Sequence, residues 1–314
     1  MPAPTPIPDS LLHGPFTRAE AKRTGLPSKA LLGKRFTRVH PRVWVHVDHP
    51  MSDLDLITAA ALAAPSYAKL TDAARLRALG YDDLPLRPIC FVVPDDHHVA
   101  LDGVLVHRTK TMPPLDDVGA TPAAAFIGCC AEERLIDLIA AGDWLVRHGH
   151  TSIAAIVELA ARDDWRPGAA RALEVAPQLN PRARSPRESK LRAYLVAAGL
   201  PVPEVNVELE VDGRMLGCVD LLYRRWMLVI EYEGRQHAED DHQFNVDISR
   251  YEGFRDRRVT YVQVTNGRFA NPRALVILVH QKLVACGYDG PAPSFGQRWR
   301  DLIAPVPGAH ARRR

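Results

Sequence analysis

The stretch from 219 to 237, VDLLYRRWMLVIEYEGRQH, constrains the fold of this chain more than any other segment. Asp220 stands inside one apolar run, and Glu231 and Glu233 stand at the end of a second one. Because successive side chains of a strand point to opposite faces, Val229, Glu231 and Glu233 share one face of the second predicted strand. Burying a carboxylate there is costly unless a partner compensates, and a divalent cation is one such partner. The stretch predicts two acidic strands around a candidate metal site.

Length and composition favour a globular protein of several domains. A chain of 314 residues predicts two or three domains at about 100–150 residues each. No apolar run reaches about 18 residues, so we expect no membrane partner. The opening MPAPTPIPDS lacks the pattern of a signal peptide, and the five cysteines show no CxxC spacing. These features favour a reducing, cytoplasmic location.

Residues 1–50 predict a winged helix-turn-helix. Thr17 and Glu20 have the spacing of a capping box that starts a helix, and Ser28 is expected to cap a second short helix. The following FTRVHPRVWVH alternates apolar and polar residues around a His-Pro step, which is typical of a small hairpin. A helix, a turn, a helix and a hairpin together form the predicted domain.

The charge of this domain favours nucleic acid as a partner. Between Arg18 and Arg42 there are eight Lys or Arg residues and a single acid, Glu20, whereas the whole chain has a net charge of only +3. Such a local excess suits contacts with phosphates. A solvated basic face on a small helical module is the alternative that composition leaves open.

The segment FTRAEA…GL…LL…G.F.RVH…VWV, roughly residues 10–48, resembles the N-terminal winged-helix domain of AbiEi-type antitoxins. The resemblance implies that DNA is a partner, and that a toxin or operon partner exists. On this basis the expected DNA contacts are Lys29, Lys34, Arg35 and Arg38. The oligomeric state is not indicated by the sequence.

Residues 51–177 predict a mixed α+β connecting domain whose role the sequence does not disclose. Ser52 is expected to cap a helix, and CFVVPDD and LDGVLVHRT are expected to be strands. Thr121-Pro122 has the pattern of another helix start, and further helices are expected over 132–147 and 151–161. The three histidines of the strand region have no regular ligand spacing, so we expect surface and strand histidines rather than a metal site; they are His97, His98 and His107.

Residues 178–187 are rich in proline and arginine and predict an exposed linker, and residues 301–314 form a basic tail. Between them, residues 188–300 predict an α/β sandwich with a mixed sheet, in the order α-β-β-β-α-β-α. Its expected elements are a helix started by Ser185, Pro186 and Glu188, two strands joined at Asp212-Gly213, a third strand over 226–234, a helix over 247–258, a fourth strand over 259–265 and a helix after Asn271-Pro272.

This order, with ESKLR on the first helix, VD on the second strand and VIEYEG on the third, resembles the PD-(D/E)XK nuclease superfamily. The most similar group comprises bacterial domains related to the very-short-patch-repair endonuclease. The resemblance covers roughly residues 185–287, and DISRYEGFRDRRVTYVQVT matches the helix and strand that follow. It implies an endonuclease that hydrolyses phosphodiester bonds of DNA with Mg²⁺ or Mn²⁺.

The predicted site is built from these acids. Neighbouring strands lie about 4.8 Å apart, so Asp220 and Glu231 can share one magnesium ion. The backbone carbonyl of Tyr232 is the expected third ligand. Glu188 is a further candidate, because the superfamily places a metal-associated glutamate on this helix, although a capping box with Ser185 explains Glu188 equally well.

Glu233 departs from the superfamily pattern, which usually has lysine at this position. Here the glutamate is expected to act as a base or a further ligand, and the missing cation must come from Arg235, His237 or Arg250. His237 is a candidate general acid or base, although a hydrogen-bonded loop histidine is an equal alternative. The departure motivates a second hypothesis, a DNA-binding, antitoxin-like transcriptional regulator whose nuclease fold is catalytically inert.

Overall fold

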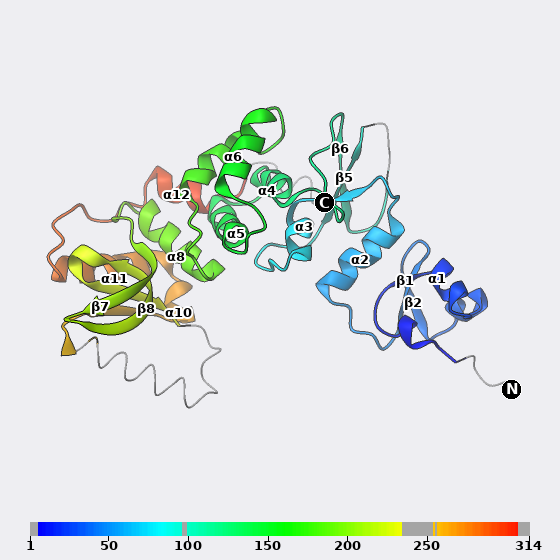
Figure 1. Cartoon of the computed structure of the whole chain (residues 1–314), viewed down its shortest axis with the longest axis horizontal. Helices are drawn as coiled ribbons and strands as arrows, with labels where there is room; N and C mark the ends of the chain where they lie inside the picture. Colours follow the sequence, from blue (N-terminus) through cyan, green and yellow to red (C-terminus); the bar gives the residue numbers. More distant parts are fainter. Residues whose placement is uncertain (1–5, 96–98, 234–253, 255, 307–314) are drawn as a thin grey trace. The chain divides into compact units, whose positions relative to one another are not determined.

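The computed structural model of the protein describes residues 6–95, 99–233, 254 and 256–306 (Figure 1). In these residues the chain is a mixed α/β protein with three small sheets, as predicted. It divides into two compact units. One comprises Met1–Ala131, Glu158–Ala170 and Pro307–Arg314, and the other comprises Glu132–Val157 and Arg171–Val306. The second unit thus includes helical residues upstream of the boundary that the sequence suggested at 177.

The first unit begins with a small helix-and-hairpin module. It consists of β1 (Phe16–Thr17), α1 (Arg18–Arg23), a 3₁₀ helix η2 (Ser28–Leu32), β2 (Phe36–His40) and β3 (Val43–His46), with antiparallel strands in the order β1-β3-β2. The predicted capping box is present, because the Thr17 hydroxyl accepts from the Glu20 N–H at 3.2 Å and the Glu20 carboxylate accepts from the Thr17 N–H at 2.7 Å. Ser28 is the first residue of η2 and makes no cap, which corrects the second predicted helix start.

The rest of the first unit is built on a second small sheet. Its elements are α2 (Asp53–Ala63), β4 (Lys69–Leu70), α3 (Asp72–Ala78), β5 (Ile89–Pro94), β6 (Val104–Thr109) and α4 (Pro122–Cys130). The strand order is β4-β5-β6, with β4 antiparallel and β6 parallel to β5. Both predicted strands are confirmed. The two strands are parallel, and Asp102-Gly103 forms a turn directly before β6, with Gly103 at φ +69°.

Further helices follow α4 along the chain, before the strands of the third sheet. They are α5 (Leu135–Arg147), α6 (Ile153–Arg162), α7 (Ala169–Val175) and the 3₁₀ helix η3 (Ala176–Gln178). The sequence predicted α5 and α6 closely, whereas it gave no separate signal for α7. None of the helices in the described residues is both long and apolar enough to cross a bilayer.

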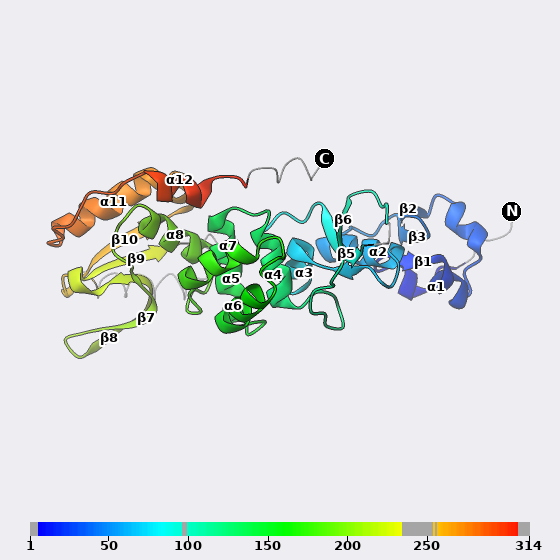
Figure 2. The ribbon, with the colours of Figure 1, turned by 90° about the horizontal axis from the view of Figure 1, so that it is seen from above.

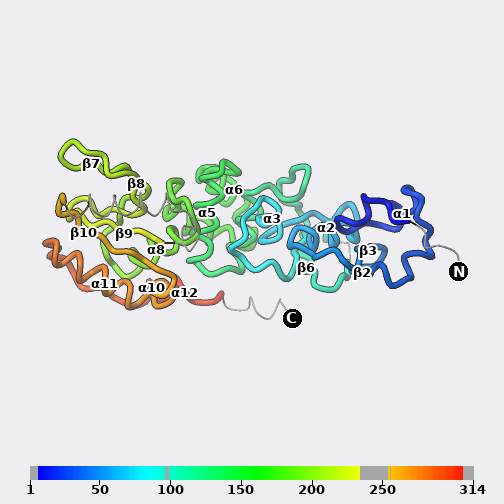
Figure 3. Tube along the Cα trace, turned by 90° about the horizontal axis from the view of Figure 1, so that it is seen from below, coloured from blue at the N-terminus to red at the C-terminus, as the bar shows by residue number. Residues whose placement is uncertain are grey.

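The second unit is built on a four-stranded mixed sheet in the order β10-β9-β8-β7. Its elements are α8 (Pro186–Ala197), β7 (Glu204–Val211), β8 (Arg214–Tyr223), the 3₁₀ helix η4 (Arg224–Trp226), β9 (Leu228–Tyr232), β10 (Thr260–Val264), α10 (Asn266–Phe269), α11 (Pro272–Ala285) and α12 (Gln297–Ile303). Strands β7, β8 and β9 are antiparallel, and β10 lies parallel to β9. The hairpin of β7 and β8 can be followed in Figure 3.

Helices α8 and α11 cover the same face of this sheet (Figure 2). Leu191 and Leu195 of α8 share one hydrophobic core with Val279 of α11 and with Leu228 and Ile230 of β9. The intervening Val229 belongs to a second core on the opposite face. The sheet is therefore buried on both sides at β9, which agrees with the nearly continuous apolar run of this strand.

The order of helices and strands agrees with the sequence prediction wherever the structure describes it. Most of the helix predicted over 247–258 lies outside the described residues, although Phe254, expected to point inward, is fully buried. Helices α10 and α12 are additions that were not predicted. Thr265 caps α10 by accepting from the Arg268 N–H, and Trp299 of α12 is buried in the same core as α8.

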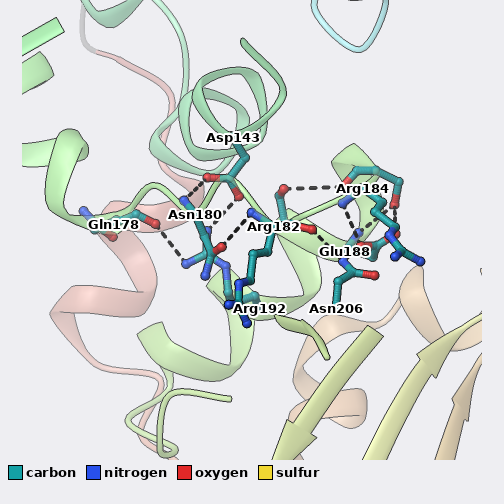
Figure 4. A network of polar contacts seen from close by, with 10 residues as sticks. Asp143, Gln178, Asn180, Arg182, Arg184, Glu188, Arg192 and Asn206 are labelled. Carbon is teal, nitrogen blue, oxygen red and sulfur yellow. Dashed lines mark hydrogen bonds and ion pairs between the residues drawn. The ribbon is translucent and has the colours of Figure 1, made fainter. Parts of the chain in front are cut away.

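Residues 178–187, predicted to be an exposed linker, are only partly exposed and lie within the second unit. Leu179 and Ala183 are buried, and distant side chains bind the polar groups of the backbone. Arg192 donates to the Gln178 carbonyl at 2.9 Å, and Asp143 accepts from the Asn180 N–H at 2.6 Å (Figure 4). Proline and arginine are typical of loops, but here the partners come from α5 and α8, which local composition cannot reveal.

Candidate functional site

Asp220 and Glu231 lie on adjacent antiparallel strands. The ladder of β8 and β9 pairs Leu222 with Val229 and Leu221 with Ile230, so Asp220 and Glu231 occupy the next step of the same register. The Asp220 Oδ2 accepts the backbone N–H of Tyr232, which directly follows Glu231, at 2.8 Å. Glu231 is only 8% exposed. The sheet thus brings together the two acids that the sequence singled out.

Near Asp220, β7 and β8 both change the face of the sheet to which their alternate side chains point. In β7, Val205 packs in the core beneath α8 and α11, whereas Val207 packs in the opposite core. In β8, Leu221 and Val219 differ in the same way. In a regular strand, residues two apart lie on the same face of the sheet. The alternation of faces is therefore interrupted between Val205 and Val207 in β7, and at the matching step of β8. Asn206 lies at this interruption in β7 and has a left-handed backbone conformation, with φ +45°. Asp220 lies opposite it in β8.

Glu188 is held in a network of structural hydrogen bonds (Figure 4). Its Oε2 accepts from the Arg184 N–H at 2.9 Å and from the Asn206 amide at 2.6 Å, and its Oε1 accepts from the Ser185 hydroxyl at 2.9 Å. The predicted Ser185 cap is present as well, because the hydroxyl accepts from the Glu188 N–H. Glu188 therefore joins the start of α8 to Asn206, the residue beside Asp220.

Tyr232 and Glu233 follow at the end of β9. The Tyr232 N–H binds Asp220, its hydroxyl donates to Asn266 at 2.6 Å and its ring packs edge-on against Phe269. The group of Tyr232 seen at Asp220 is thus the N–H, whereas its carbonyl was the predicted ligand. Glu233 is exposed and donates its N–H to the Val264 carbonyl at 3.0 Å.

The remaining residues of the predicted cluster are Arg235, His237 and Arg250, and they lie outside the described residues. The described part of the cluster consists of two neighbouring carboxylates, Asp220 and Glu231. Both offer hard oxygen donors, the type that Mg²⁺ prefers. A carboxylate has about four acceptor positions, so accepting the Tyr232 N–H does not by itself prevent Asp220 from binding a cation. The donor set fits a magnesium ion that keeps several water ligands.

The N-terminal module presents a basic surface. Lys29, Lys34 and Arg38 are exposed, and Arg35 is half-buried. The exposed basic residues of the module are Arg18, Lys22, Arg23, Lys29, Lys34, Arg38 and Arg42. Leu32, at the end of η2, is 80% exposed between two of them in the chain. An exposed leucine next to basic residues is compatible with an interaction surface, and it adds an apolar contact to the predicted phosphate contacts.

The structure reveals a cluster that the sequence did not predict. Ligand atoms of Asp72, Cys90 and His107 lie within 4.8 Å of one another, and across the described ranges they are the one set of three His, Cys, Asp or Glu residues this close. His107 lies in β6, as expected, but its Nε2 is 3.0 Å from the Asp72 carboxylate. The three residues come from separate elements, so no regular spacing in the sequence predicts that they lie together.

Comparison of the chain with protein-family models, with curated proteins and with solved structures gave no match.

Proposed function

We propose that the second unit is an endonuclease-like domain that hydrolyses phosphodiester bonds of DNA with Mg²⁺ or Mn²⁺. The observation that carries the proposal is the Asp220 carboxylate fixed at the Tyr232 N–H next to the buried Glu231. The order of α8, three antiparallel strands and the parallel β10 supports it, because this is the arrangement that the resemblance to PD-(D/E)XK nucleases implies. A cytoplasmic location is part of the same proposal.

In this proposal the residues have separate roles. Asp220 and Glu231 hold the cation, which supplies charge neutralisation at the phosphate and a nucleophilic water. Glu188 and Asn206 keep β7 in register beside Asp220. Glu233, at the exposed end of β9, takes the place of the usual lysine, and the basic N-terminal module contacts DNA phosphates.

The test uses supercoiled plasmid, the full-length protein and Mg²⁺. We expect nicking that a chelator stops and that Asp220→Asn and Glu231→Gln each reduce by at least about 100-fold, since each removes a ligand charge at the metal. Glu204→Gln is the matched control, because Glu204 is an exposed acid on β7 paired with Arg224. Nicking that persists in Asp220→Asn and Glu231→Gln at the unmodified rate would refute the assignment.

The second candidate is a DNA-binding, antitoxin-like regulator with an inert nuclease fold. Glu233 favours it, because a carboxylate replaces the cation that the superfamily uses to polarise water. This candidate predicts salt-sensitive DNA binding without cleavage under any divalent cation, and co-purification with a toxin or operon partner. Metal-dependent nicking that requires Asp220 would exclude it.

A further inference from the structure

The sheet of the first unit places three dissimilar ligand groups at one point. Leu70 of β4 pairs with Phe91 of β5, and the next N–H, of Thr71, donates to the Cys90 carbonyl. Asp72 therefore begins α3 beside Cys90. On the other side of β5, His107 of β6 pairs with Val92, which shares a face with Cys90. Three elements thus direct a carboxylate, a thiol and an imidazole to the same place.

The geometry of the cluster suits a shared ion better than a catalytic relay. In a Cys-His-Asp relay the acid binds one imidazole nitrogen and the sulfur binds the other. Here a single nitrogen of His107 lies within 4.8 Å of both the Cys90 sulfur and an Asp72 oxygen. Zinc ligands stand ~2.0–2.3 Å from the metal, so tetrahedral neighbours are separated by ~3.3–3.8 Å. Small movements of the side chains would therefore bring the three ligand atoms to the separations found around zinc.

The surroundings hold the carboxylate in place. The Thr71 hydroxyl donates to Asp72 Oδ1 at 3.0 Å, and the Asp72 backbone has φ +51°. The carboxylate lies directly against Gly128 of α4, where an added Cβ would come within 1.9 Å of Oδ1. Only glycine at 128 leaves room for Asp72 in this position. The His107 side chain is 31% exposed, so the cluster is accessible to solvent from its side.

We propose that Asp72, Cys90 and His107 bind a divalent transition-metal ion such as Zn²⁺, with a fourth position available to water. A thiolate and an imidazole select borderline or soft cations over Mg²⁺ and Ca²⁺. Three protein ligands with one open position are typical of zinc sites that bind or activate a small ligand. This site is separate in residues and in metal preference from the acids of the second unit, so it does not rest on the proposed nuclease function.

The test is a Co²⁺ titration of the full-length, chelator-treated protein, followed by absorption spectroscopy. We expect a thiolate-to-metal charge-transfer band and the intense d–d bands of four-coordinate cobalt, both saturating at one Co²⁺ per chain, and loss of both on adding Zn²⁺. Excess Mg²⁺ should leave the bands unchanged. Cys90→Ser should remove the charge-transfer band, whereas Cys286→Ser, a half-buried cysteine of the second unit, should retain it.

Two further variants keep the test decisive if Cys90→Ser does not fold. His107→Gln changes a partly exposed side chain and should weaken Co²⁺ binding at least about 10-fold, the effect expected on losing one ligand of three. Gly128→Ala displaces the Asp72 carboxylate and should weaken binding as well, while Asp220→Asn should not. Absence of the bands in the unmodified protein, or their persistence at full affinity in Cys90→Ser or His107→Gln, would overturn the proposal.

Discussion

At the scale of single residues, one ion pair in the second unit is buried almost completely. Arg192 of α8 and Asp143 of α5 meet at 2.8 Å, with side chains only 8% and 1% exposed. Burial raises the pKa of the Asp143 carboxyl, and the charge of Arg192 opposes this effect. Arg192 also binds the Gln178 carbonyl, so the pair joins two helices to the segment between them.

We expect Arg192→Met to destabilise the second unit by about 3–5 kcal/mol at neutral pH, because it leaves a buried charge without a partner. The loss should be smaller near pH 4. Without Arg192 the folded pKa of Asp143 rises further above its unfolded value, so protonation at lower pH relieves the penalty. Hydrogen exchange of α5 and α8 measures the change.

The matched control for this variant is Arg224→Met. Arg224 pairs with Glu204, but the side chains are 50% and 42% exposed, so the loss should stay within ~1 kcal/mol. If both arginine variants lost the same amount of stability, burial would not explain how much the Arg192–Asp143 pair contributes to the free energy of unfolding.

Asn206 combines two features that substitutions can separate. Its backbone is left-handed, at φ +45°, and its amide donates to Glu188 and to the Arg182 carbonyl. Asn206→Gly keeps the backbone conformation and loses the hydrogen bonds, whereas Asn206→Ala loses both. We expect the alanine variant to be the less stable by about 1 kcal/mol, measured by chemical denaturation. A more stable alanine variant would contradict the role of the left-handed backbone.

At the scale of helices and strands, the sequence predicted what depends on neighbouring residues. The capping box at Thr17, the helix cap at Ser52 and the turn at Asp212-Gly213 are in place, because each needs only a few consecutive side chains. That Asp220 and Glu231 lie on neighbouring strands was predicted, and the structure adds the register that sets them at the same step of the ladder. What the sequence missed depends on distant partners: the bonds of α5 and α8 to segment 178–187, and the Asp72, Cys90 and His107 cluster, whose members meet only after the sheet has formed.

The turn between α6 and α7 gives a prediction at this scale. Arg166 binds Asp163 at 2.7 Å and also donates to the Thr111 and Met112 carbonyls, so it ties the loop after β6 to this turn. Hydrogen bonds from Arg162 and Arg166 lower the pKa of Asp163 to about 2. The stabilisation is therefore present above the unfolded pKa of about 3.9 and is lost as pH falls towards 2.

Titration of the Asp163 carboxyl by NMR should show this low midpoint, and Arg166→Ala should raise it towards the ordinary value. The same variant should increase hydrogen exchange in residues 110–113. An unchanged midpoint in Arg166→Ala would mean that Arg162 alone is responsible.

At the scale of the whole molecule, the small net charge of +3 conceals an uneven distribution. The basic residues exposed on the N-terminal module should dominate binding to nucleic acid. We expect replacement of Lys29, Lys34 and Arg38 by alanine to weaken DNA binding and to lower the slope of log K against log salt by up to about 0.9 per lost phosphate contact. Fluorescence anisotropy over a range of salt concentrations measures this slope.

Replacement of three exposed basic residues of the second unit is the control: Arg147, Arg214 and Arg298. A slope that changes equally in both triple variants would show that charge anywhere on the chain suffices, and that the N-terminal module has no special role.

The mixed sheet of the second unit also has a consequence for the order of folding. Strands β7, β8 and β9 follow one another through short turns, whereas β10, which lies parallel to β9, begins 28 residues after β9 ends. Contacts between close neighbours along the chain form sooner than those that must close a long loop. Asp220 and Glu231 belong to the early hairpins. The two acids therefore reach neighbouring positions on the ladder of β8 and β9 before β10 completes the sheet.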